Sequence, residues 1–394
     1  MQLPARSYKS SLLNAALFTT VAIRYAVLLR ALPGRATRYD FSIYYDWAVA
    51  VRRGLDPYAA DLYGQGLSLG LEVPNRQAVY PPPALSVFGL LGYLPIHSAY
   101  WIWMALSAIA FALALALLFD RFRLGGTAPA VVALILLSPP VTTHLWYGQS
   151  QFLILLLLVL VMRCLWRRRD ELAGLALAAA ILFKAFPAVI IGYMLTQRRW
   201  KAVGWTLCGL VLGEMAMISA TGLKEWTEFL KSQAGAAPGV ENMAVAGLIA
   251  RICGQVFSAA GAAAGRAILV AGFQVSLLLA TYAATLGGDD SGGGCFGLWV
   301  AAMVAASPIV WEHYLVLLII PVVALAAAAA AGRVSRRAKL AMLAACVLVF
   351  AIHPLTLILP QSGAAAILAE YGVAVLVLVY LSAWWLVRDR AAPS

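Results

Sequence analysis

The chain has 394 residues, of which 63% are hydrophobic and only 12% are charged, and its formal net charge is +12. A soluble domain carries about 25% charged residues, so this composition excludes an ordinary water-soluble fold. The positive charge does not indicate a nucleic-acid partner, because the basic residues lie in short loops between apolar runs. The lipid bilayer is the expected partner instead.

The apolar runs predict an all-α, polytopic membrane protein. A transmembrane helix needs about 20 apolar residues. The first run is longer than a signal-peptide core and lacks a small-residue cleavage site, so we expect it to be retained. Twelve segments are predicted to cross: residues 12–31, 99–119, 128–145, 152–166, 172–184, 187–196, 202–220, 265–286, 295–310, 314–331, 340–358 and 364–387.

Two places depart from this regular pattern. The segments 172–184 and 187–196 are each too short to cross about 30 Å as straight helices, so they predict a tilted or broken pair. Residues 84–94 are also too short and follow prolines, which predicts a helix that enters the membrane part-way and is buried against protein. We expect one membrane domain over residues 1–394, with large outer loops at 32–97 and 221–262.

The basic residues predict the orientation. If the N-terminus is cytoplasmic, nearly every basic cluster falls on the inner side, as the positive-inside rule requires. Both large loops, all four histidines and Lys184 then face outward. We therefore expect a multi-pass protein of the cell (inner or plasma) membrane whose site faces away from the cytoplasm. The inner clusters are Arg121 and Arg123; Arg167, Arg168 and Arg169; Arg198, Arg199 and Lys201; Arg333, Arg336, Arg337 and Lys339; Arg388 and Arg390.

Asp40 is the first candidate for chemistry, in the first outer loop. An acid just beyond a membrane helix is most often a solvated loop charge, and that alternative stays open for the other acids of the loop. Asp40, however, begins a helix-like run and is surrounded in sequence by aromatic residues that could exclude water. A partly desolvated carboxylate is suited to act as a general base.

Lys184 and Glu312-His313 interrupt apolar sequence. Lys184 lies three residues before Pro187, and its alternative role is to extend to the lipid headgroups. An ionisable residue in a membrane segment is costly and is by default a functional candidate, and an ammonium could hold a phosphate. Glu312-His313 could instead belong to an interfacial aromatic belt. The histidine spacings do not fit a zinc site, so no metal is expected.

Three further regions carry polar candidates. His144 and Gln149 follow a proline break and could simply form an outer turn. Tyr80 precedes prolines that most simply begin a helix. Arg251 lies on an otherwise apolar stretch of the second outer loop, which suits a buried anionic partner, and Asn242 lies in the same loop.

Taken in chain order, these motifs resemble glycosyltransferase family 87, over roughly residues 39 to 320. The resemblance lies in the order of the motifs, since each one alone is weakly specific. It implies a GT-C fold with about 12 membrane segments and a large first outer loop. The motifs are Asp40-Phe-x-x-Tyr44-Tyr, Gly54-x-Asp-Pro-Tyr58, Tyr80-Pro-Pro, Tyr147-Gly-Gln149, Lys184-x-x-Pro187, Ser307-Pro308 and Trp311-x-His313-Tyr.

The resemblance also implies an activity. Such enzymes transfer a sugar, with inversion, from a polyprenyl-phosphate carrier to a lipid-linked or glycan acceptor on the outer side of the membrane. The family is typified by mannosyltransferases of glycolipid biosynthesis in the cell envelope, so mannose is the expected sugar. Besides this donor substrate no cofactor is expected, and because no second acid forms an Asp-x-Asp pair with Asp40, the reaction is expected to be metal-independent.

Residue roles follow from the resemblance by position. The family's catalytic aspartate falls on Asp40, and its lysine and histidine motifs fall on Lys184 and His313. A glycosyl phosphate needs a base on the acceptor and cations on the departing phosphate, so Lys184, Arg251 and His313 are predicted to bind the donor phosphate. The predicted substrate-contacting residues are Tyr44, Tyr80, His144, Gln149, Asn242 and Glu312.

Two other classes of function compete with the enzyme. A transporter or flippase of lipid-linked sugars would place broken helices near the bilayer midplane between repeats. The sequence shows no internal repeat, and its polar residues gather near one face, which favours the enzyme. A non-catalytic scaffold for envelope assembly would predict that the outer acids are dispensable.

Overall fold

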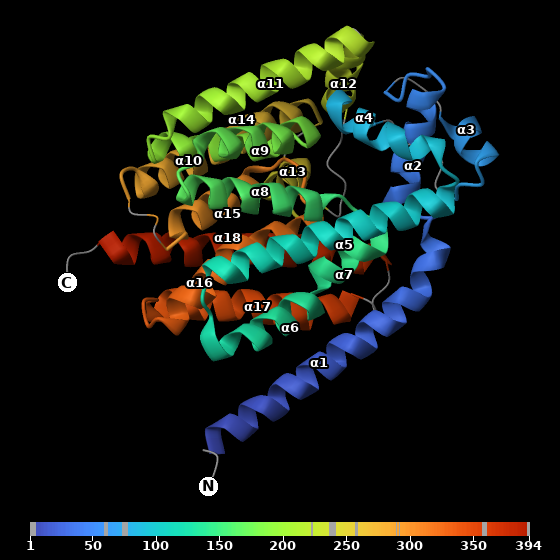
Figure 1. Ribbon diagram of the computed structural model, residues 1–394. Coiled ribbons are helices and arrows are strands. Elements are labelled where there is room, and N and C mark those ends of the chain that lie inside the picture. The colour runs from blue at the N-terminus through green and yellow to red at the C-terminus, as the bar shows by residue number, and fades with distance from the viewer. Residues whose placement is uncertain are drawn as a thin grey trace.

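A computed structural model of the chain describes residues 5–58, 62–72, 78–221, 224–235, 242–256, 259–288, 290, 292–356 and 361–391. Every regular element within these ranges is a helix, which confirms the predicted all-α class. Figure 1 shows long helices side by side, with the short helices α2, α3 and α4 at one end of the bundle. Parts of both predicted outer loops (59–61, 73–77, 222–223, 236–241 and 257–258) lie outside the described residues.

The first third of the chain places several short helices between two long ones. The predicted part-way helix at 84–94 is formed by α4 and η2, and both pack against α2. Phe88 of α4 is fully buried, whereas Val87, Leu90 and Tyr93 are exposed, so protein covers only one face of this segment. The elements are α1 (Ala5–Ala31), η1 (Leu32–Arg35), α2 (Asp40–Arg52), α3 (Tyr63–Ser68), α4 (Pro82–Gly89), η2 (Leu90–Tyr93) and α5 (Ile96–Arg121).

Proline divides two helical stretches in the middle of the chain. Pro139 begins α7 directly after α6 ends, and the two helices are bent by 46°. The predicted break near Pro187 is also present, since α9 ends at Phe183 and a 3₁₀ turn follows. The elements are η3 (Gly125–Thr127), α6 (Ala128–Leu137), α7 (Pro139–Tyr147), α8 (Gln151–Trp166), α9 (Asp170–Phe183), η4 (Phe186–Val189), α10 (Ile190–Thr196) and α11 (Trp200–Thr221).

The last third encloses a central helix. All 13 residues of α15 are buried, and the helix packs against α14, α16 and α18. A helix that is apolar on every side belongs in the interior of a bundle. The elements are α12 (Lys224–Gly235), α13 (Val245–Val256), α14 (Ala259–Thr285), α15 (Gly294–Ala306), η5 (Glu312–Leu318), α16 (Ile319–Ala330), α17 (Arg336–Thr356) and α18 (Gln361–Ala391).

The helices fit a multi-pass membrane protein. Among the described residues, six helical stretches are long and apolar enough to cross a membrane, or seven if α6 and α7 form one bent span. Each of the twelve predicted crossings overlaps a helix or helix pair, but α15 ends at Ala306, before the predicted end at 310, and residues 357–358 lie outside the described ranges. Several of these are short, however: α8, α15 and the pair η4 and α10 have between 10 and 17 residues.

Small residues allow the closest helix packing. A Cβ atom on Gly209 of α11 would lie 2.8 Å from the Cβ of Ala178 on α9, closer than two carbon atoms normally approach. Without a hydrophobic force between helices in lipid, such close backbone approach is a main source of association. The four-residue spacing of Gly209 and Gly213, which meets Leu182 of α9, keeps this contact on one side of α11.

Arginines of the predicted inner clusters contact residues of neighbouring helices at one end of the bundle. Arg121 stacks on Trp166 with its guanidinium carbon 4.2 Å from the ring centroid. Arg199 pairs with Asp170 at 3.3 Å, and Arg337 pairs with Asp389 at 2.5 Å. The short helices α2 to α4 lie at the opposite end (Figure 1), so the basic residues and the first large loop are separated along the bundle as the sequence predicts.

Candidate active site

Asp40 lies in the first turn of α2, where the helix dipole favours a carboxylate. Its Oδ2 atom accepts a hydrogen bond from Nε2 of Gln149, which follows α7. The amide oxygen of the same glutamine accepts a bond of 2.7 Å from the Tyr44 hydroxyl. Gln149 therefore fixes the carboxylate of Asp40 relative to the phenol of Tyr44. Asp40 and Tyr44 lie one turn apart on α2, whereas Gln149 is more than 100 positions away in the sequence.

Gly148 makes this placement of Gln149 possible. It ends α7 in the left-handed conformation, with φ at 67°. A Cβ atom there would lie 2.9 Å from the Cβ of Phe41, so any other residue meets both backbone strain and a clash with α2. The Gly148 carbonyl accepts a bond of 2.7 Å from the indole of Trp103 on α5. The turn is thus held from two sides.

A chain of hydroxyl groups continues from Gln149 into the protein. The Tyr44 and Tyr80 hydroxyls are 3.0 Å apart, and the Tyr80 and Ser150 hydroxyls are 2.8 Å apart. Burial, followed by the neighbouring Tyr314, raises the pKa of Tyr80 above its ordinary value, so its phenol stays protonated. Each of these hydroxyls can donate as well as accept, which suits a site that must orient a sugar.

Lys184 is held by aromatic rings. It follows the last residue of α9, is 8% exposed, and places Nζ 4.7 Å from the ring centroid of Tyr80 and 4.6 Å from that of Tyr314. It also donates a hydrogen bond of 3.3 Å to the Tyr314 hydroxyl. Tyr80, Tyr44 and Gln149 thus connect Lys184 to the half-buried Asp40. We call these five residues, together with His313 and Tyr314, the Asp40 group.

His313 belongs to the same group. Its side chain is 5% exposed, and its ring centroid lies 6.5 Å from that of Tyr147 and 5.2 Å from that of Tyr314. It lies within electrostatic range of Lys184. The two neighbouring residues of η5 thus contact different elements: Tyr314 contacts Lys184, and His313 contacts Tyr147 at the end of α7.

His144 is buried deeper among helices. Its Nε2 atom is 3.1 Å from the Ser107 hydroxyl, and its ring stacks on Phe152 at 3.6 Å between centroids. It lies within electrostatic range of Lys184. These contacts connect α5, α7 and α8 behind the Asp40 group, and a direct contact of His144 with substrate stays a prediction.

Glu312 joins three elements. One carboxylate oxygen accepts a bond of 2.6 Å from the Thr143 hydroxyl of α7, and the other accepts a bond of 2.7 Å from the Tyr371 hydroxyl of α18. The side chain is 8% exposed. Both bonds come from neutral hydroxyls, so the carboxylate ties η5 to the helices on either side of it. Its predicted contact with substrate stays a prediction.

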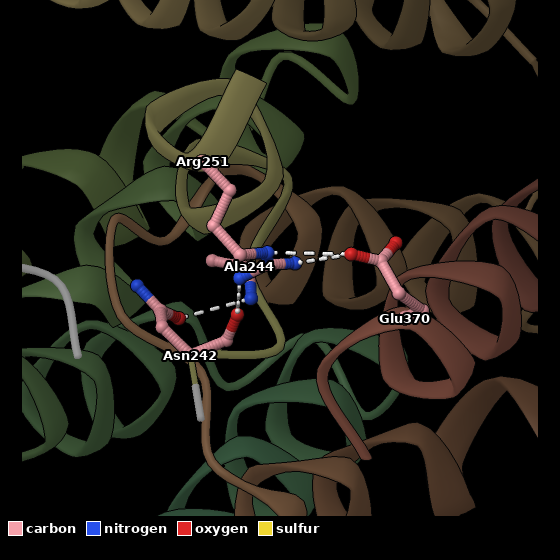
Figure 2. Close-up of polar contacts among 4 residues, drawn as sticks. All are labelled: Asn242, Ala244, Arg251 and Glu370. Atoms are coloured by element: carbon pink, nitrogen blue, oxygen red, sulfur yellow. Dashed lines mark hydrogen bonds and ion pairs between the residues drawn. The ribbon is translucent and has the colours of Figure 1, made fainter. Parts of the chain in front are cut away.

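Asn242 and Arg251 form a second polar group (Figure 2). Asn242 is fully buried, and its amide oxygen accepts bonds of 2.9 Å from the backbone NH groups of Ala244 and Val310. Arg251 of α13 donates to the Asn242 carbonyl at 3.1 Å and pairs with Glu370 of α18 at 3.0 Å. The anionic partner of Arg251 in the structure is thus a carboxylate of the chain, and this carboxylate is exposed rather than buried. Its predicted role on the donor phosphate stays a prediction.

The Asp40 group has the parts of an acid–base site that handles a phosphate. It contains one carboxylate at a helix N-terminus, one ammonium without a carboxylate within 4.0 Å among the described residues, and a set of hydroxyl donors. A carboxylate can take a proton from an acceptor hydroxyl, and a nearby cation can stabilise charge on a leaving phosphate. In the described parts of the chain, no three His, Cys, Asp or Glu side chains converge as a metal site would.

Three residues of this region were not among the predicted site residues. Tyr314 belongs to the Trp311-x-His313-Tyr motif and Ser150 directly follows Gln149, so both positions carried a usable signal. Tyr371 lies in an apolar run of α18, where its sequence gives no indication that its hydroxyl reaches Glu312.

Curated relatives share part of the chain. An alpha-(1->3)-arabinofuranosyltransferase of Corynebacterium glutamicum is 28% identical over 132 residues, which cover 32% of this chain and 31% of that protein. Enzymes of the same name from two strains of Mycobacterium tuberculosis are 26% identical over 170 residues, 42% of this chain and 37% of theirs. The matches thus span about a third of the relatives' own length.

A solved structure and a family model also match. The crystal structure of ArnT from Cupriavidus metallidurans bound to undecaprenyl phosphate aligns with 95% of this chain and 78% of its own, with a TM-score of 0.38 and 16% identity. A TM-score this low supports no conclusion about individual residues or ligands of this chain. The model of glycosyltransferase family 87 matches residues 78–308, which is more than half of the chain. The chain therefore belongs to glycosyltransferase family 87.

Proposed function

We propose that the chain transfers a sugar from a polyprenyl-phosphate carrier to a hydroxyl of a lipid-linked or glycan acceptor, with inversion at the anomeric carbon. One observation carries the proposal: in a chain of family 87, a glutamine and two tyrosines connect the carboxylate of Asp40 to the ammonium of Lys184. The family match begins at residue 78, so the role of Asp40 rests on its position in the structure and on the resemblance of its motif.

The reaction needs one base and one cation. Asp40 takes the proton of the acceptor hydroxyl while that oxygen bonds to the anomeric carbon. The bond from this carbon to the phosphate oxygen breaks on the opposite face, and the electron pair leaves with the polyprenyl phosphate. Lys184 stabilises the charge that develops on the phosphate, and His313 lies beside it.

The surrounding polar residues position these groups. Gln149 donates to Oδ2 of Asp40 and so fixes the orientation of the proposed base. Tyr44 and Tyr80 supply protonated hydroxyls between the Asp40 and Lys184 sides of the group. Such fixed donors lower the reorganisation needed in the transition state.

The identity of the donor sugar is a separate and more specific part of the proposal. The resemblance of the motifs favours mannose, whereas the relatives that match are named arabinofuranosyltransferases. We therefore give arabinofuranose priority as the donor sugar and test mannose beside it. Because a polyprenyl phosphate presents the same leaving group with either sugar, Asp40 and Lys184 serve both.

The proposed location is the cell membrane, with the Asp40 group on the outer side. The arginine clusters gather at the other end of the bundle, which the positive-inside rule places in the cytoplasm. A single cysteine introduced at Ser68 on α3 should therefore react with an impermeant thiol reagent in intact cells, and one at Arg168 should not. The reverse labelling pattern would overturn the orientation.

The activity is tested with the full chain in lipid nanodiscs. Radiolabelled polyprenyl-phosphoarabinofuranose and polyprenyl-phosphomannose are supplied in parallel, with acceptor lipids extracted from the native membrane. We expect transfer of one sugar to an acceptor lipid, and its loss in Asp40→Asn. A flippase, the competing function, would instead move the intact labelled donor between leaflets of proteoliposomes in both wild type and variant, with no transfer.

A further inference from the structure

A cavity of about 650 Å³ lies at the end of the bundle opposite the Asp40 group. The connection between α5 and α6 meets the end of α16 there, as Figure 1 shows. Three arginines line the cavity: Arg121, Arg123 and Arg333. A volume of this size falls in the range of sites for small molecules or headgroups.

The charged side chains that line the cavity are all basic. None of the described residues that line it is Asp or Glu. Asp120, the acid next to Arg121 in sequence, pairs with Arg163 at 2.6 Å and interacts more weakly with the charge of Arg123. The stacking of Arg121 on Trp166 orders one guanidinium at the edge of the cavity. A guanidinium binds a phosphate through two parallel hydrogen bonds, which favours a phosphate-bearing ligand.

Apart from Thr127, the remaining residues that line the cavity are apolar or glycine. Ala327 and Ala331 line the cavity from the end of α16, and Phe122 lines it from the end of α5. A Cβ atom placed on Gly125 or Gly126 would meet nothing within 4 Å, so the cavity is open on that side. A soluble anion needs only the arginines, whereas a lipid also needs apolar surface beside them. The ends of two apolar helices, α5 and α16, provide that surface beside the arginines.

We propose that this cavity binds the headgroup of an acidic phospholipid, with the phosphate between Arg123 and Arg333 and the first acyl carbons against the alanines of α16. The positive-inside rule explains why arginines occur at this end, but it does not require three of them to surround one cavity. Basic pockets between membrane helices are a general means of binding acidic headgroups. The inference does not depend on the proposed transfer reaction.

Native mass spectrometry of the full chain, released from mixed phosphatidylglycerol and phosphatidylcholine nanodiscs, tests the proposal. We expect phosphatidylglycerol to stay bound to wild type, and its retention to fall about a hundredfold in Arg123→Ala with Arg333→Ala, since each charge-assisted contact contributes about tenfold. The matched control is Arg167→Ala with Arg336→Ala, two exposed arginines that do not line the cavity. It should keep most of the bound lipid.

Two results would overturn the proposal. Equal loss in the control pair would show that the lipid responds to surface charge in general. Displacement of the lipid by millimolar inorganic phosphate would show a site for soluble anions. If the alanine pair does not fold, Arg123→Lys with Arg333→Lys decides: it keeps the charge but not the paired hydrogen bonds, so we expect about tenfold weaker retention, and retention equal to wild type contradicts the site.

Discussion

Lys184 and Arg251 are both cations in an apolar setting, but they have different kinds of bonding partner. Arg251 pairs with Glu370 and with a backbone carbonyl, and so connects α13 to α18. Lys184 is surrounded by the rings of Tyr80 and Tyr314, and among the described contacts its only hydrogen bond is to a phenol. A cation that already has a carboxylate has little capacity left for a phosphate, whereas one held by aromatic faces keeps it.

The largest expected effect is at Asp40, the proposed base. Asp40→Asn keeps the shape of the side chain but removes the base, so transfer should fall by about 10²- to 10⁴-fold in the nanodisc assay. Asp46→Asn is the matched control, because Asp46 lies on the same helix and bonds to Gln65 away from the group. Equal activity of Asp40→Asn and wild type would remove Asp40 from the mechanism.

Removal of the Lys184 charge should have the next largest effect. Lys184→Met keeps the length and the contacts with the rings but loses the ammonium, so we expect the turnover to fall by about 10²- to 10³-fold. Lys184→Arg should recover part of it. A loss confined to donor affinity, with the turnover unchanged, would mean that Lys184 binds the ground state only.

The turn at Gly148 is expected to matter for stability. Gly148→Ala forces a side chain into the left-handed conformation and against Phe41, so the protein should be destabilised by about 1–3 kcal/mol. Thermal unfolding followed in detergent measures this effect. Gly126→Ala is the control, because a Cβ atom there meets nothing within 4 Å, and it should leave the unfolding temperature nearly unchanged.

The smallest effect is expected at Arg251 and Glu370. Their side chains are 21% and 55% exposed, so a double-mutant cycle with Arg251→Ala and Glu370→Ala should give a coupling of about 0.2–1 kcal/mol. Both single variants should affect the enzyme alike if the pair is structural. A loss of donor binding in Arg251→Ala that Glu370→Ala does not share would instead support the predicted phosphate role of Arg251.

The sequence predicted the helices well because apolar length and proline act locally. The breaks before Pro139 and Pro187 were visible for this reason. The site was predicted in part: Asp40, Gln149 and Lys184 belong to motifs, but their convergence depends on how α2, α7 and α9 pack. The partners of Arg251 and Glu312 could not be predicted, because Glu370 and Tyr371 lie over fifty residues away in an apolar run.

The buried central helix has a consequence for biogenesis. Thirteen residues of helix rise about 20 Å, less than the roughly 30 Å of the hydrocarbon core, and α15 has no face left for lipid. During synthesis α15 emerges before α16 and α18, the helices that later cover it. We therefore expect the translocon or an insertase to shelter α15 until the C-terminal helices arrive, so that truncation before α18 yields a chain that is degraded rather than a smaller enzyme.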